Sequence, residues 1–256
     1  MGRRSPQIEI NFDEGRWGGR RKGAGRKPGT GRRPVPHRVR PELNGRHPVH
    51  VTCRLLPGLP RLRGFELAKV LRRAFVRGCD KRVRSSRAPD AEVLFRICHF
   101  SVQGNHIHLI CEARDAAELA RGIQGWKIRV TRGLNRNWHR IGTVFDGRYH
   151  AQVMKTPLQV RNGLLYVLHN AVRHGHELPK WANGIDPFSS AWYFDGWSDD
   201  AWRHGLPPPA EDPDAPGEPV APPGTWLLRT GWWKHYGLID VDEVPPAAKA
   251  ARRRTA

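Results

Sequence analysis

The residues with the clearest chemical potential are two histidines that one isoleucine separates, His106 and His108, within the mostly apolar run 105–111. Side chains of a β-strand alternate between its two faces, so both imidazoles lie on one face and Ile107 enters a core on the other. Two imidazoles whose backbone positions are about 6–7 Å apart can share one divalent ion. The alternative is a strand with two solvent-facing histidines, and the pair needs further functional groups before it indicates a metal site.

A second polar group follows about sixty residues later in the chain. Tyr166 and Asn170 are four residues apart, so on a helix they share one face, and Asn162 and Arg173 extend that row. A phenol can attack a phosphodiester that a divalent ion polarises, and the Asn170 amide oxygen could complete the ion's coordination beside the two histidines. Mg²⁺ or Mn²⁺ accepts such mixed ligands, whereas closed zinc sites use four side-chain ligands. Taken alone, the pair is more simply explained as a surface tyrosine on a helix.

Hydrophobic periodicity predicts the elements that position these groups. Apolar alternation predicts a strand over residues 47–56, and helical spacing predicts a helix over residues 64–76. A second strand is predicted over residues 92–102, and the turn residues 103–105 lead directly into a third strand over residues 106–111. The second and third strands are therefore expected to pair as an antiparallel hairpin.

A long helix is predicted after this hairpin. Asp115 is a suitable N-cap, and apolar residues recur at helical spacing from Leu119 to Leu134. The polar side of the same helix is basic and is predicted to contact DNA through Arg129, Arg132 and Arg136.

The last two predicted elements are a strand near residues 143–154 and the helix that carries Tyr166. Thr156 is its predicted cap, Pro157 takes the first position, and the pattern runs to a stop at Gly175. The order β-α-β-β-α-β followed by a helix is typical of a ferredoxin-like domain. The predicted fold class is α+β, an antiparallel sheet with helices on one face and an additional C-terminal helix carrying the tyrosine.

Composition favours a nucleic-acid partner. The 256 residues include 44 Lys and Arg against 24 Asp and Glu, a net charge of +20. Ten tryptophans and a 38% hydrophobic content indicate that part of the chain packs into a core. No run of about 18 apolar residues and no secretory signal is evident, so a cytoplasmic, nucleoid-associated protein without a membrane segment is expected. Four cysteines without a C-x-x-C pair favour reduced, buried thiols.

Five segments are predicted along the chain. They are a basic Gly/Arg-rich arm (1–46), a catalytic domain (47–176), an extension packing on it (177–206), a Pro-rich acidic linker (207–224) and a Trp-rich tail with a frayed basic end (225–256). The arm is expected to follow a phosphate backbone or to lie in a minor groove. Its densest basic residues are Arg20, Arg21, Lys22, Arg26 and Lys27. The alternative is a solubilising tail that binds any polyanion.

Three motifs carry a family resemblance: Gly-Asn-His-Ile-His-Leu-Ile over residues 104–110, Val-Phe-Asp-Gly-Arg-Tyr-His over residues 144–150, and Leu-Tyr-Val-Leu-His-Asn over residues 165–170. In this order they resemble the REP-associated tyrosine transposases, a group of the HUH single-tyrosine transposases. The resemblance spans about residues 47–176. One departure is Ala171, where many relatives carry proline directly after the asparagine, and it affects helix geometry more than chemistry.

The resemblance implies an HUH endonuclease fold in which His106 and His108 bind Mg²⁺ or Mn²⁺. It implies that Tyr166 attacks single-stranded or hairpin DNA, leaving a 5′-phosphotyrosine link and a free 3′-hydroxyl. Asn170 stands where members place a further polar residue, often Gln or Asn. In related enzymes the tyrosine helix comes from the same chain or from a partner, so a homodimer is possible.

Two open questions concern the basic residues and catalysis. Arg148, His150 and Arg173 are candidate phosphate contacts, although a water-facing pair at a sheet edge explains Arg148 and His150 equally well. Tyr149 is a rival nucleophile but is assigned to packing or base stacking.

An active DNA nickase and strand transferase is the favoured hypothesis. The alternatives are a transposase descendant that binds nucleic acid without catalysis and, more distantly, a ribosome-associated basic protein.

Overall fold

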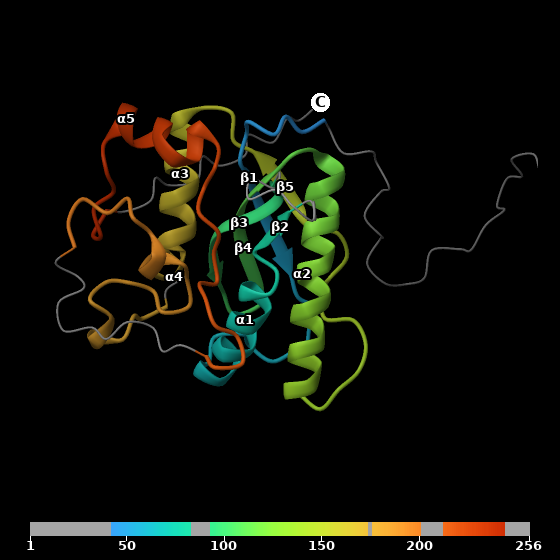
Figure 1. The fold of residues 1–256 in the computed structure, drawn as a ribbon. Coiled ribbons are helices and arrows are strands. Elements are labelled where there is room, and N and C mark those ends of the chain that lie inside the picture. Colours follow the sequence, from blue (N-terminus) through green and yellow to red (C-terminus); the bar gives the residue numbers. More distant parts are fainter. Residues whose placement is uncertain (1–41, 83–92, 174–175, 201–211, 244–256) are drawn as a thin grey trace, which may run out of the picture. The chain divides into compact units, whose positions relative to one another are not determined.

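The computed structural model describes residues 42–82, 93–173, 176–200 and 212–243, and a five-stranded antiparallel sheet runs through its centre (Figure 1). The strand order is β2-β3-β4-β1-β5. The strands are β1 (Val49–Arg54), β2 (Asp80–Arg82), β3 (Val93–Val102), β4 (His106–Ala113) and β5 (His150–Val153).

Five α-helices and a short π-helix accompany the sheet in the described ranges. The α-helices are α1 (Phe65–Val76), α2 (Ala116–Asn137), α3 (Pro157–Leu168), α4 (Asn170–Arg173) and α5 (Trp232–Tyr236), and the π-helix is Leu227–Gly231. Without the short edge strand β2, the order is β-α-β-β-α-β followed by helices. This confirms the predicted α+β class and the ferredoxin-like arrangement of the antiparallel sheet.

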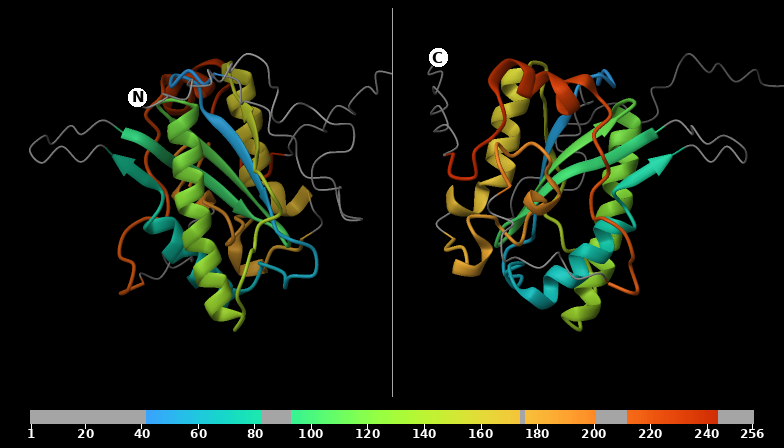
Figure 2. Two further views of the ribbon diagram at one scale, coloured as in Figure 1. Left: turned by 90° about the vertical axis from the view of Figure 1, so that its right-hand side faces the viewer. Right: turned by 60° about the vertical axis from the view of Figure 1, so that its left-hand side comes forward.

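The two faces of the sheet are covered by different helices. Helices α1 and α2 pack on one face, in a core that contains Val51, Ile107 and Trp126. Helix α3 packs on the other face, where Ile110 and Leu164 belong to a second core. Figures 1 and 2 show α2 and α3 on opposite sides of the strands. The predicted alternation is thus confirmed, and the histidine face of β4 lies under α3.

Helix starts follow the local chemistry of the sequence. Asp115 Oδ1 accepts a hydrogen bond from the Glu118 backbone N–H at 2.8 Å, and this cap begins α2. Thr156 Oγ1 accepts one from the Gln159 N–H at 3.2 Å, and Pro157 occupies the first position of α3. Both predicted caps are confirmed.

Two predicted elements are shorter in the structure. The tyrosine helix does not continue to Gly175: α3 ends at Leu168, His169 leaves helical geometry with φ −102° and ψ 14°, and α4 resumes at Asn170. The strand near residues 143–154 is reduced to β5, because Gly147 adopts a left-handed φ of 64° that extended pairing does not allow.

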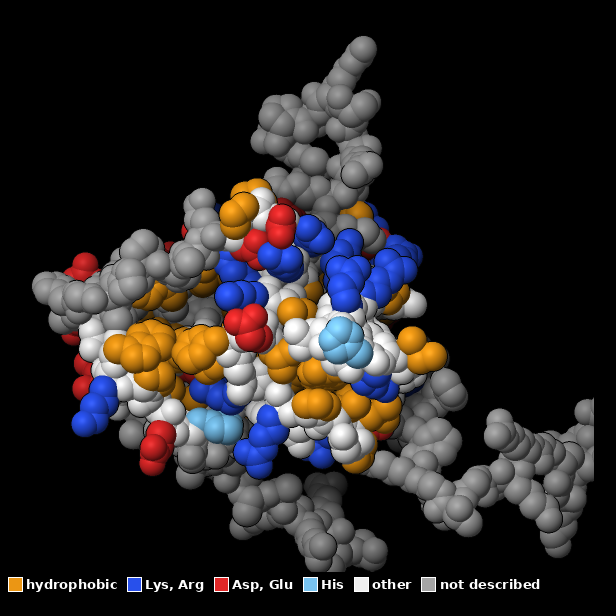
Figure 3. Space-filling view, turned by 90° about the horizontal axis from the view of Figure 1, so that it is seen from below, with side chains coloured by type: hydrophobic (Ala, Val, Ile, Leu, Met, Phe, Trp, Pro, Cys, Tyr) orange, Lys and Arg blue, Asp and Glu red, His pale blue; other side chains and the backbone are white. Residues whose placement is uncertain are grey.

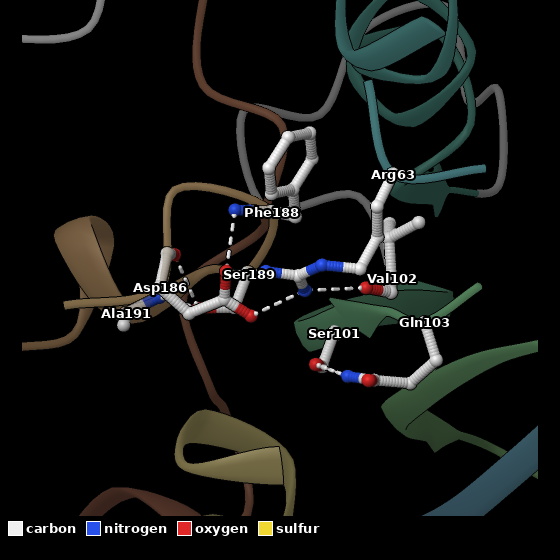
Figure 4. Close-up of polar contacts among 8 residues, drawn as sticks. All are labelled: Arg63, Ser101, Val102, Gln103, Asp186, Phe188, Ser189 and Ala191. Atoms are coloured by element: carbon white, nitrogen blue, oxygen red, sulfur yellow. Dashed lines mark hydrogen bonds and ion pairs between the residues drawn. The ribbon is translucent and has the colours of Figure 1, made fainter. Parts of the chain in front are cut away.

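The segment 176–200 is fastened to the sheet by a buried ion pair (Figure 4). The Arg63 guanidinium donates to both carboxylate oxygens of Asp186, at 2.8 and 3.0 Å, and to the Val102 carbonyl at 2.9 Å. The Phe188 ring lies 4.5 Å from the same guanidinium. Because Asp186 is only 2% exposed, its charge depends on this two-point pairing.

The described C-terminal residues also pack against α1 and β3. Arg72 donates to the Ala215 carbonyl at 2.9 Å, and the Ala221 N–H donates to the Ile97 carbonyl at 2.9 Å. In α5, Trp232 is 2% exposed and belongs to the same core as α3, so the Trp-rich segment packs through a short helix of its own.

Two smaller predictions concern cysteines and membranes. All four cysteines are buried and free, as predicted. In the described ranges, no helix combines the length and the apolar character that crossing a membrane requires.

Candidate active site

Strand pairing gathers polar side chains beside His108. On β1, Thr52 lies opposite both His108 of β4 and His150 of β5, while His50 lies two residues before Thr52. Residues at such spacing point to the same side of the pleated sheet. His50, Thr52 and His108 therefore meet on the face that α3 covers.

His108 is held by two side chains of β1. It is 3% exposed, and its Nδ1 lies 3.1 Å from Thr52 Oγ1 and 3.1 Å from His50 Nε2. If Nδ1 carries the proton, either neighbour can accept it, which leaves the Nε2 lone pair available. A metal-binding histidine needs this tautomer, and its second nitrogen usually donates to such a neighbour.

His106 has a comparable partner at the end of β4. Its ring lies edge-on to His108, with the centroids 4.7 Å apart, and its Nδ1 lies 2.8 Å from Asn105 Oδ1. An amide oxygen only accepts, so in the neutral ring this contact favours the tautomer with the proton on Nδ1 and the lone pair on Nε2. The two histidines are therefore arranged to offer the same type of donor atom.

His50 is uncharged at neutral pH. Burial, and secondarily the positive charge of His150, lower the pKa of His50 to about 4. A neutral His50 can present Nε2 as an acceptor to His108, whereas a protonated ring would compete for the same position as a donor. The low pKa thus favours the tautomer that leaves His108 Nε2 available.

Tyr166 approaches this group from α3. Its half-buried ring is edge-on to His108 with centroids 5.1 Å apart, and it contacts His50 at 5.5 Å. Val160 and Leu164 of the same helix are fully buried against the sheet and fix the helix there. Within one chain, the structure therefore places the predicted nucleophile against His108, one member of the predicted histidine pair.

Asn170 lies just beyond the helix break and is completely buried. Within the described ranges, neither its Oδ1 nor its Nδ2 has a hydrogen-bond partner, so no direct bond joins it to either histidine. A buried amide without a partner is destabilising by about 1–3 kcal/mol. Such a group is suited to an additional ligand.

The donor set fits Mg²⁺ or Mn²⁺ better than zinc. No three His, Cys, Asp or Glu side chains in the described residues are grouped closely enough to hold a metal ion. Two imidazoles and one amide would leave several coordination positions to water or to phosphate oxygens, as these hard ions prefer. The residues are therefore compatible with the predicted ion.

The predicted DNA contacts divide between the two sides of the sheet. Arg129, Arg132 and Arg136 are exposed on α2, across the sheet from Tyr166. Arg132 and Arg148 line a groove of about 740 Å³ between α2 and the loop before β5. His150, by contrast, is exposed on the strand next to Thr52.

The surface seen from below in Figure 3 carries many Lys and Arg side chains with exposed hydrophobic side chains between them. Tyr149 is half-buried against the core under α2, which agrees with its assignment to packing. The remaining predicted contacts fall outside the described residues or side chains: Arg20, Arg21, Lys22, Arg26, Lys27 and Arg173.

Three residues of the site were not singled out from the sequence: His50, Thr52 and Asn105. The first two carried a usable signal, because they alternate with the buried Val49, Val51 and Cys53 on the predicted strand. Their partner became visible only with the register between β1 and β4.

No protein-family model matches this chain, and no curated protein matches it. Among solved structures, it is similar to a REP-associated tyrosine transposase bound to a REP hairpin, with a TM-score of 0.45 and 18% identity over 61% of this chain and 82% of that chain. The function proposed below therefore rests on the residues themselves and on their arrangement.

Proposed function

We propose that this chain is a metal-dependent DNA endonuclease and strand transferase of the HUH tyrosine transposase type. The observation that carries the proposal is the contact between Tyr166 and His108, whose ring centroids are 5.1 Å apart although the residues come from different elements. A phenol in contact with one member of a histidine pair is the combination that tyrosine-mediated phosphodiester cleavage requires.

The proposed reaction exchanges one phosphodiester for another. The Tyr166 oxygen attacks phosphorus, the bond to the 3′-oxygen breaks, and that oxygen leaves as a 3′-hydroxyl after taking a proton. The fragment downstream of the cleaved bond stays linked to Tyr166 through its 5′-phosphate. Because a phosphate ester bond is conserved, a second 3′-hydroxyl can reverse the step and join another strand without ATP.

The ion would be held by His106, His108 and Asn170, and when bound it would polarise the scissile phosphate. The chain's own residues perform the remaining tasks. Thr52, His50 and Asn105 orient the two imidazoles through the contacts described above. Helix α3 positions the phenol, and its burial keeps that position fixed.

DNA is the proposed polymeric substrate. The net charge of +20 supports a polyanion, and the exposed His150 and Arg148 lie near the histidine face and in the α2 groove respectively. Single-stranded or hairpin DNA is preferred, because attack by a side chain on a half-buried helix requires an accessible, unpaired backbone.

The test is formation of a covalent adduct. Purified protein is incubated with 5′- or 3′-labelled hairpin DNA carrying a single-stranded extension, with Mn²⁺ or Mg²⁺, and adducts are resolved under denaturing conditions. In wild type the 3′ label should appear in the adduct and the 5′ label should be released with the 3′-hydroxyl fragment, whereas Tyr166→Phe should bind DNA without forming an adduct. Tyr149→Phe is the matched control and should remain active.

Two results would contradict the proposal. An adduct that persists in Tyr166→Phe would exclude this nucleophile. Metal-independent DNA binding without any adduct in the wild type would instead assign the chain to the non-catalytic nucleic-acid-binding class.

The contact within one chain also predicts that a single chain supplies both halves of the site. Tyr166→Phe and His108→Ala each remove one half, so a mixture of the two variants should form no adduct. Recovery of activity in the mixture would show that the tyrosine acts on the site of a partner chain.

A further inference from the structure

A cavity of about 680 Å³ lies near the end of β4 that is remote from His106. Its walls come from the end of β4, the first residues of β3, residues 45–47 and the start of the Trp-rich segment. Its fixed charges come from three arginines and one glutamate, which are Arg46, Arg96, Arg114 and Glu112. The net charge of the lining is therefore positive. None of these residues takes part in the proposed cleavage.

Trp226 forms an open aromatic wall of this cavity. Its side chain is 51% exposed, although it is held from behind. A Cβ at Gly231 would lie 2.6 Å from Trp226 Cζ3, so the ring rests directly on the glycine backbone. The His235 ring stands edge-on to Trp226 with the centroids 6.1 Å apart. One side of the indole is therefore supported, and much of its surface is available for stacking.

The acidic residue of the cavity is already engaged. Glu112 accepts hydrogen bonds from the Gly224 N–H at 2.8 Å, the Thr225 N–H at 2.9 Å and the Thr225 hydroxyl at 2.7 Å. It also pairs with Arg96 at 3.5 Å. Since this carboxylate fixes the residues just before Trp226 and is nearly buried, its charge is largely compensated within the protein.

The other two arginines face a different situation. Arg46 is exposed, and its guanidinium forms no ion pair with any of the described residues, while Arg114 pairs with Asp115 at 3.2 Å and with Glu118 at 3.8 Å. An anionic ligand with a planar apolar part matches both the charge and the indole wall.

We propose that this cavity binds an unpaired nucleotide of the DNA substrate, with its base stacked on Trp226 and its phosphate near Arg46 and Arg114. The inference rests on the proposed function, since it takes DNA as the substrate. Glu112 is six residues from His106 along β4, a span of about 20 Å at 3.4 Å per residue. That span is at most about six nucleotide steps, the number for stacked duplex spacing of 3.4 Å, and it exceeds one step, so the bound nucleotide belongs to a single-stranded flank and not to the cleaved linkage.

The experiment compares two labelled DNAs that share one hairpin, with and without a ten-nucleotide single-stranded extension. Affinity is measured by fluorescence anisotropy for wild type, Trp226→Ala and Trp226→Phe. Trp181→Ala is the matched control, because Trp181 is also 54% exposed and does not line this cavity. Loss of one base stack corresponds to about tenfold to hundredfold in affinity.

The expected result is specific to the extension. Trp226→Ala should weaken binding of the extended DNA by about tenfold or more and leave the bare hairpin unchanged, whereas Trp226→Phe should bind like wild type. Arg46→Ala should reduce the slope of log affinity against log salt by about 0.7 for the extended DNA only. Iodouracil placed in the extension should photocross-link to Trp226.

Three results would overturn the inference: unchanged binding of the extended DNA by Trp226→Ala, an equal loss for the bare hairpin, or an equal loss in Trp181→Ala. Equally effective competition by polyglutamate of matched charge would assign the cavity to an acidic protein segment. Because all of these readouts measure binding, they are independent of adduct formation. Nucleotide binding in the cavity can therefore be refuted while cleavage by Tyr166 is supported. Conversely, adducts can be absent while the cavity binds DNA.

Discussion

Removal of the Thr52 hydroxyl tests how His108 is oriented. Thr52→Val keeps the β-branched shape of the side chain on β1 but deletes one of the two groups that lie 3.1 Å from His108 Nδ1. The Nδ1 proton can still be donated to His50. We therefore expect Thr52→Val to fold normally and to weaken Mn²⁺ binding only modestly.

The expected loss of Mn²⁺ affinity follows from the number of acceptors that remain for the His108 Nδ1 proton. One hydrogen bond contributes about 0.5–1.5 kcal/mol net, so loss of the hydroxyl should weaken Mn²⁺ binding by about threefold to tenfold. His50→Phe should give a similar loss, because Thr52 still accepts. The double variant leaves Nδ1 without either partner, and loss of such outer contacts typically weakens metal binding by about 10–100-fold. The double effect should at least equal the product of the two single effects.

The assay is calorimetric titration of DNA-free protein with Mn²⁺, so that metal affinity is separated from cleavage. Thermal unfolding of each variant checks that the fold is intact. Thr131→Val, half-buried on α2 across the sheet, is the matched control and should bind Mn²⁺ like wild type. A double variant with unchanged Mn²⁺ affinity would refute the assigned orientation of His108.

Three further predictions concern stability and DNA binding. Burial lowers the pKa of His99 from 6.5 to about 3, so the unfolded chain binds more protons between these values and stability should fall as pH is lowered through this window. His99→Gln should flatten this dependence by up to about 1.4 kcal/mol per pH unit in urea unfolding, and an unchanged slope would contradict the cause given. Gly122→Ala should cost about 1–3 kcal/mol in the same assay, because the added methyl group collides with the Phe95 ring. At Gly125 the added methyl group would lie 3.2 Å from the flexible Arg129 Nη1, so Gly125→Ala should instead gain up to about 1 kcal/mol. Loss of stability in both variants would argue against a packing cause. Arg132→Ala should lower the salt slope of hairpin binding by about 0.9 for every sequence tested, and an unaltered slope would remove this residue from the interface.

Local signals in the sequence predicted more of the fold than of the site. Asp115 and Thr156 cap helices through contacts within three residues, so their roles depend on little beyond their neighbours. The alternation around His106 and His108 likewise depends only on strand geometry. Such features can be predicted because the physics that causes them is local.

The partners of His108 depend on pairing between distant strands. Thr52 and His50 reach its Nδ1 only because β1 and β4 pair in one register, and a shift by one residue would turn them to the other face. The break at His169 was also missed, since the sequence 157–175 has no proline or glycine at that point. His169 is buried with its ring edge-on to Trp197, a tertiary contact that helix periodicity does not reveal.

The strand order limits how DNA can reach both groups of predicted contacts. Arg132 lies on the α2 side of the sheet, Tyr166 lies on the α3 side, and the sheet between them is continuous from β2 to β5. At the β5 edge the two sides come close in sequence: Arg148 lines the α2 groove, whereas the charge of His150 acts on His50 beside Tyr166. Under the proposed function, a DNA strand that contacts both groups by this route would pass around the β5 edge, and residues 148–150 would then lie between the groove on α2 and the proposed cleavage site under α3.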